Sequence, residues 1–121
     1  MVDVGLKPGM KQLAQITPAN TTTISAIKKE RRSNLIVAYV VVCNTTGSDA
    51  EFSVFVDNNG TTYNDTTALF ANNVVNAKST TVLDFSHAGL PLNVDVAAGN
   101  LAVKSNTNSA ITFSIYGIET R

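Results

Sequence analysis

One unbroken apolar run constrains the fold of this chain more than any other feature of the sequence. Residues 35–43 read LIVAYVVVC, with no polar position between them. A strand buried on one face alternates apolar and polar side chains, whereas a run without alternation avoids water on both faces. The run is about half of the 18 or more residues that a membrane-spanning helix requires. It therefore predicts a central β-strand whose second face is covered by another segment of the chain or by another subunit.

Other segments predict further strands. Residues 92–96 and 111–116 alternate apolar and polar side chains with a period of two, which indicates half-buried strands. Residues 52–56 have the same period, with Phe52, Val54 and Val56 on one face and Ser53 and Phe55 on the other. Weaker candidates are residues 11–16, 21–27, 80–85 and 101–104. Turn residues separate these segments, and only 15% of the residues are charged, which disfavours long exposed helices. The sequence predicts an all-β chain of about eight strands in an antiparallel β-sandwich of jelly-roll or immunoglobulin-like type.

Length and charge bound the organisation of the chain. Its 121 residues fit one domain, expected at residues 10–121 and preceded by an N-terminal arm at residues 1–9. Nine basic and nine acidic residues give no net charge, so the electrostatic signature of a nucleic-acid-binding protein is missing. The N-terminus lacks the basic flank and apolar stretch of a secretory signal. We expect no nucleic-acid partner, no membrane insertion and a product that stays where it is made.

The sequence contains few residues of the kinds that catalytic and metal-binding sites require. His87 is the only histidine and lies in a predicted turn beside Ser86, where a surface role explains it better than a catalytic one. Cys43 is the only cysteine, so no internal disulfide can form, and we expect a buried, inert thiol. One cysteine and one histidine cannot supply the three or four ligands of a zinc site. No glycine-rich phosphate-binding motif occurs. The expectation is a protein without catalytic residues, cofactor or metal.

One cluster of basic residues could contact a partner. It holds four of the nine basic residues, Lys28, Lys29, Arg31 and Arg32, and the acidic residue Glu30 lies between the two pairs. A solvated loop is one interpretation and docking on an acidic protein surface is another, with phosphate contact a third. Nucleic-acid patches usually also carry interleaved aromatic residues, which this segment lacks.

Two aromatic residues are candidates for an apolar subunit contact. Phe55 lies opposite the alternating apolar face of residues 52–56, so it is expected to point away from the core of its own domain. Tyr39 lies within the apolar run, whose two faces cannot both be covered by a simple two-layer sandwich. Both residues are therefore predicted to lie at a partner interface.

Five short motifs, taken in order, resemble those of small virion structural proteins of tailed bacteriophages. They are PANTT at 18–22, VVVCNT at 40–45, FSV at 52–54, AAGN at 97–100 and FSIYG at 113–117. The resemblance covers roughly residues 10–119, and the KKERR segment at 28–32 departs from it. It implies a β-sandwich protein that is made in the cytoplasm of the infected bacterium and built into the virion.

The resemblance implies a non-enzymatic capsid decoration, or cement, protein that forms homo-oligomers, with a trimer as one option, and docks on other virion proteins such as the major capsid protein. A tail, baseplate or fibre-associated protein is the alternative. A sugar-binding or receptor-binding module is a further alternative, which would need exposed aromatic residues on loops. Tryptophan is absent and Tyr63 is the only aromatic residue clearly in a predicted loop. This supply of aromatic residues favours the structural role.

Overall fold

The protein is described by a computed structural model that places residues 10–27, 34–57, 62–87, 89–92 and 100–120. These residues form strands and no helix. The strands are β1 (Met10–Ile16), β2 (Ile24–Ile27), β3 (Asn34–Asn44), β4 (Ala50–Asp57), β5 (Ala68–Val75), β6 (Thr80–Asp84), β7 (Leu90–Leu92), β8 (Asn100–Ser105) and β9 (Ile111–Thr120). The predicted all-β class is confirmed. The predicted arm at residues 1–9 and the basic cluster at 28–32 lie outside the described residues.

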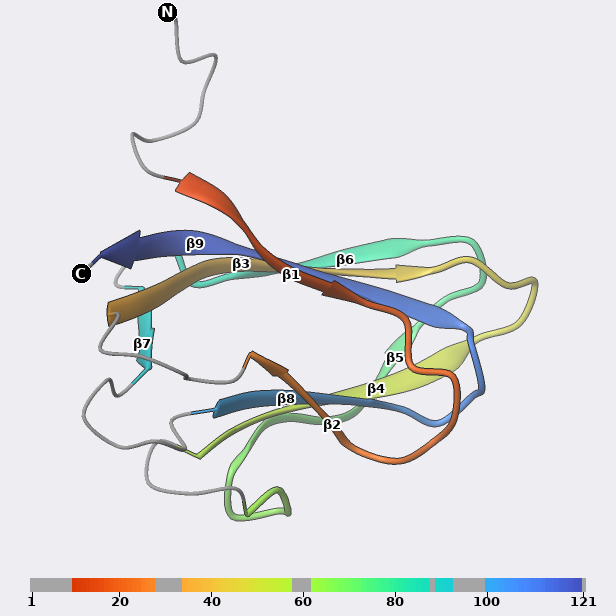
Figure 1. Ribbon diagram of the computed structural model, residues 1–121. Helices are drawn as coiled ribbons and strands as arrows, with labels where there is room; N and C mark the ends of the chain where they lie inside the picture. The colour runs from red at the N-terminus through yellow and green to blue at the C-terminus, as the bar shows by residue number, and fades with distance from the viewer. Residues whose placement is uncertain (1–9, 28–33, 58–61, 88, 93–99, 121) are drawn as a thin grey trace, which may run out of the picture.

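The strands form two antiparallel sheets that face each other as the layers of a sandwich (Figure 1). The five-stranded sheet has the order β1-β9-β3-β6, with β7 also paired to β3, and the four-stranded sheet has the order β2-β8-β4-β5. With β7 set aside, the chain pairs from the outside inwards: β1 with β9, β2 with β8, β3 with β6, and β4 with β5. A long hairpin folded over in this way is a jelly roll, one of the two sandwich types expected.

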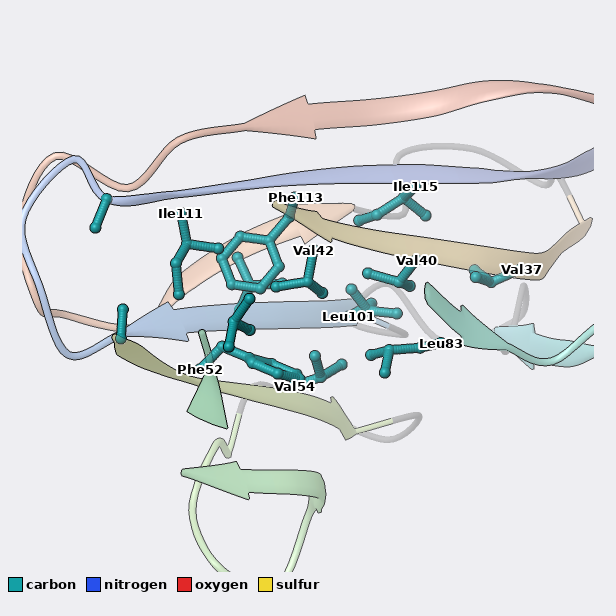
Figure 2. Close-up of a cluster of buried hydrophobic side chains, with 14 residues drawn as sticks. Val37, Val40, Val42, Phe52, Val54, Leu83, Leu101, Ile111, Phe113 and Ile115 are labelled. Carbon is teal, nitrogen blue, oxygen red and sulfur yellow. The ribbon is translucent and has the colours of Figure 1, made fainter. Parts of the chain in front are cut away.

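The core lies between the two sheets (Figure 2). Ile111, Phe113 and Ile115 of β9 are fully buried, as their period of two predicts. The ring of Phe113 meets the ring of Phe52 from β4 edge to face, with centroids 6.3 Å apart. Burying each such side chain stabilises the fold by about 1.5–3 kcal/mol. The alternation in β4 and β9 therefore places Phe52 and Phe113 in contact between the layers.

The central strand β3 has one face in the core, and within the described residues no other segment of the chain covers its second face. Val37, Val40 and Val42 enter the core and are fully buried. On the opposite face, Tyr39 and Val41 remain partly exposed in the described part of the chain. Side chains of the flanking strands β9 and β6 half-bury this second face from the sides. Within the described residues, this second face of β3 therefore has neighbouring strands on both sides but no layer packed on top of it.

A buried asparagine fixes the end of β3. The Asn44 side-chain amide donates hydrogen bonds to the backbone oxygens of Ser48 at 2.8 Å and Val75 at 3.0 Å. Its Oδ1 accepts from the backbone N–H of Thr46 at 3.0 Å and from the Thr46 hydroxyl at 2.8 Å. Asn44 therefore holds the turn after β3 against the end of β5.

Strand β5 was not predicted. Its side chains are mostly exposed, so the segment lacks the alternation that marks a half-buried strand. Asn72 interrupts it with a positive φ of 53°, and its backbone N–H donates to the Ser53 hydroxyl at 3.0 Å instead of continuing a regular ladder. The strand predicted at residues 92–96 falls almost wholly outside the described residues, and β7 ends at Leu92.

Candidate interaction surface

The solvent side of the five-stranded sheet brings residues of β1, β9, β3 and β6 into rows. Opposite residues of an antiparallel pair point to the same side of a sheet, so each row crosses the strands. One row is Gln15, Ser114, Val41 and Val82, and a second is Gln12, Tyr116, Tyr39 and Asp84. The flanking rows are Met10, Ile118 and Ile36 at one end and Thr17, Thr112, Cys43 and Thr80 at the other. We call these four rows the outer face.

Apolar side chains of the outer face remain in contact with water. Val82 is 53% exposed and Ile36 is 42% exposed. Val41 lies between the β9 and β6 positions of its row and is only half-buried. Covering apolar area yields about 25 cal/mol for each Å² removed from water. A surface that packed on this face would gain stability from these side chains.

The polar side chains along β1 are already paired with those of β9. The Gln15 amide donates to the Ser114 hydroxyl at 3.1 Å, and the Gln12 amide donates to the Tyr116 hydroxyl at 3.3 Å. The hydroxyl groups of Thr17 and Thr112 lie 2.7 Å apart. These bonds hold the side chains in place, so a partner would meet a largely preformed surface.

Asp84 is the only outer-face residue that carries a charge at neutral pH. Its carboxylate accepts from the Ser86 hydroxyl at 2.6 Å and from the Ser86 backbone N–H at 2.8 Å. Because these bonds favour the ionised form, they lower the pKa of Asp84 below its ordinary value of 3.8. The charge sits at the β6 edge, and the rest of the face offers no like charges to repel a second copy.

The residues predicted to lie at a partner interface do not share one surface in the structure. Tyr39 lies on the outer face and is half-buried. Phe55 belongs to the other sheet and is only 6% exposed, so the prediction that it offers exposed apolar surface is wrong. Its ring is covered by Tyr63 from the loop after β4, with centroids 6.3 Å apart. Lys28, Lys29, Arg31 and Arg32 lie outside the described residues.

Sequence reasoning missed Ile36 and Val82 as surface residues. A signal was present for Val82, because Leu83 beside it is buried in the core and neighbouring strand residues point to opposite sides. Ile36 was hidden within the apolar run, where sequence alone gives no indication of which face meets solvent. The pairing of β3 with its neighbours decides this.

The structure also places Cys43 and His87, the only cysteine and the only histidine of the sequence. Cys43 lies half-buried on the outer face and not in the core, because Val42 and Asn44 occupy the core-facing positions on either side of it. His87 is exposed in the turn that follows β6. Within the described ranges, no three His, Cys, Asp or Glu side chains are grouped to hold a metal ion. No helix in the same ranges has the length and apolar character needed to cross a membrane.

Comparisons with known proteins give little further information. No protein-family model matches the chain, and no curated protein matches its sequence. Among solved structures, a similar chain occurs in a structure of infectious bursal disease virus, strain Gx, with 12% sequence identity and a TM-score of 0.46. The alignment covers 98% of this chain and 38% of the viral chain, so the present chain spans well under half the length of that protein.

Proposed function

We propose that the protein is a non-enzymatic structural component of a tailed-bacteriophage virion, a capsid decoration protein that self-associates and docks on the particle. The resemblance of its sequence motifs to small virion proteins supports the class. The jelly roll is compatible with it, since this fold serves in capsid and lectin domains among others. The observation that carries the proposal is the outer face, with Val82 and Ile36 exposed and a single charge at its edge.

The size of the outer face sets the strength of the expected contact. Four strands spaced about 4.8 Å apart, each contributing residues over about 25 Å, give about 500 Å² of flat area. A standard interface buries roughly 800 Å² on each partner. One contact through this face is therefore expected to be weak, and many copies on one particle would strengthen it through avidity.

A second copy of the same chain is the proposed occupant. The face is nearly neutral, so two copies can approach without strong repulsion, and its exposed valine and isoleucine would be covered on both. If the two copies meet face to face, the contact closes as a dimer, whereas a head-to-tail contact closes as a trimer or a larger ring. Sedimentation distinguishes these arrangements by mass.

The experiment compares two valine-to-lysine variants by sedimentation velocity over a range of protein concentrations. Val82→Lys places a charge on the outer face, and Val74→Lys places the same charge on β5 of the other sheet, where Val74 is 55% exposed. We expect wild type and Val74→Lys to form oligomers and Val82→Lys to remain monomeric.

Binding to purified capsids lacking the protein is measured in parallel. We expect Val82→Lys to bind capsids more weakly than Val74→Lys because it loses avidity. A strictly monomeric wild type at all concentrations, or equal association by the two variants, would overturn the proposed mode of assembly. Wild-type protein that binds purified tails and not capsids would overturn the assignment to capsid decoration.

A further inference from the structure

A groove of about 330 Å³ lies on the solvent side of the four-stranded sheet. Strands β4, β5 and β8 contribute lining residues, and so do residues 63–66 before β5. The residues that matter for its chemistry are Ser53, Phe55, Tyr63, Asp65, Asn72 and Lys104. They come from β4, the loop that follows it, β5 and β8. The pairing of β4 with both β5 and β8 brings Ser53, Asn72 and Lys104 together. The groove is on the sheet opposite the outer face, so it is independent of the proposed assembly contact.

An aromatic pair forms the apolar part of the groove. Phe55 is nearly buried, and the ring of Tyr63 packs on it at a tilt of 47°. Tyr63 is itself only half-buried and lines the groove. A half-exposed aromatic ring held in place by a second ring offers a fixed apolar surface to a ligand.

The loop that carries Asp65 is held by its own hydrogen bonds. Asn64 Oδ1 accepts from the Thr66 backbone N–H at 2.8 Å and from the Thr66 hydroxyl at 2.6 Å. The Thr67 backbone N–H donates to the Asn64 backbone oxygen at 3.0 Å, and the Thr67 hydroxyl donates to the Thr62 backbone oxygen at 2.8 Å. Binding would therefore require little ordering of the loop, which lowers the entropy cost of association.

The lining residues from β4 and β5 are also held in place. Asn72 has a φ of 53°, a conformation that asparagine accepts more readily than most residues. The Ser53 hydroxyl accepts from its backbone N–H at 3.0 Å and lies 3.5 Å from its Oδ1. This leaves the Asn72 side-chain N–H groups without a partner among the described residues. The Lys104 ammonium and the Asp65 carboxylate likewise have no hydrogen bond or ion pair within those residues.

We propose that this groove binds a neutral pyranose unit of a glycan. A sugar hydroxyl both donates and accepts hydrogen bonds, so neighbouring hydroxyls match a groove lined by an acceptor, the Asp65 carboxylate, and by two donors, Lys104 and Asn72. The C–H face of a pyranose is apolar and packs on the Tyr63 ring. One positive and one negative side chain leave the groove without net charge, which disfavours a phosphate or another strongly anionic ligand.

The dimensions fit the same ligand class. Small-molecule sites typically have volumes of about 300–1,000 Å³ and combine an apolar surface with a few placed polar groups. The groove lies at the lower end of this range and is suited to one or two sugar rings, with the remainder of a glycan extending into solvent.

The test is saturation-transfer NMR with the complete chain and a panel of glucose, galactose, mannose, N-acetylglucosamine and N-acetylgalactosamine, each also as a β-linked disaccharide. At least one sugar of the panel is expected to bind. Asp65→Ala and Lys104→Met should each weaken that binding about tenfold, as expected for loss of a hydrogen bond to a charged group. Asp84→Ala removes an exposed carboxylate from the opposite sheet and should leave the affinity unchanged.

Three results would overturn the proposal: no binding by any sugar of the panel, equal binding by Asp65→Ala, Lys104→Met and wild type, or binding of inorganic phosphate in preference to every neutral sugar. Chemical-shift spectra of each variant establish that it is folded before binding is measured. None of these outcomes bears on self-association through the outer face, so the two proposals fail separately.

Discussion

Replacing Asn44 with alanine should destabilise the protein strongly, although the residue takes no part in either proposed binding surface. The Asn44 side chain is fully buried and makes four hydrogen bonds at the junction of β3, the following turn and β5. Alanine would leave the Val75 backbone oxygen without its side-chain donor inside the protein. Losing a buried partner costs about 1–3 kcal/mol.

The other three bonds involve groups that water can reach in part, so they contribute less. At about 0.5 kcal/mol each, they bring the expected loss for Asn44→Ala to about 3 kcal/mol. Small domains are stable by about 5–15 kcal/mol, so this single change removes a large share of the total.

Urea denaturation followed by circular dichroism measures the effect. Asn76→Ala is the matched control, because Asn76 is exposed on the neighbouring turn and its change should cost less than about 0.5 kcal/mol. A loss below about 1 kcal/mol for Asn44→Ala, or equal losses for the two variants, would refute the role assigned to the Asn44 amide.

Three further changes test other parts of the structure. Gly117→Ala should lower the free energy of unfolding by about 1–3 kcal/mol, since the added Cβ would overlap the Ile36 backbone oxygen and lie 2.9 Å from Leu13 Cδ1; an unchanged urea midpoint would contradict this packing. Phe55→Ser should lower the free energy of unfolding by about 3–5 kcal/mol or more, which is the cost of truncating a buried phenylalanine. A variant with wild-type thermal stability would show that Tyr63 does not cover the ring. The pKa of Asp84 is lower in the folded state than its ordinary value of 3.8, so its contribution to stability is complete above that pH and is lost as the pH falls through the lowered value. Asp84→Asn should therefore lose less stability than wild type between neutral pH and strong acid in pH-dependent urea titrations, and identical acid profiles would count against the Ser86 bonds.

The strands that dominate the core could be predicted because their burial is expressed locally. Ile111, Phe113 and Ile115 alternate with polar residues, and the same pattern in β4 placed Phe52 and Val54 in the core. The length of the central run also identified β3 as a central strand. These features depend only on which face of a strand meets the opposite sheet.

The features that sequence could not supply depend on long-range pairing. Periodicity correctly placed Phe55 on the side away from the core, but only the folded loop shows that Tyr63 covers it. Strand β5 escaped prediction because its exposed side chains and the positive φ of Asn72 remove any regular pattern. The groove is lined by both Asp65, from the loop before β5, and Lys104, from β8, and nothing near either residue in the sequence indicates the other.

The rate at which Cys43 reacts with a maleimide, measured over a range of protein concentrations, tests the central claim most directly. Cys43 is the only cysteine and lies on the outer face, so it reports on this surface without any added probe. If the outer face is the contact between copies, the labelling rate of wild-type protein falls as oligomers form, whereas that of Val82→Lys stays at the monomer value. A wild-type rate that is the same for monomers and oligomers would contradict the account, because it would show that the copies associate through another surface.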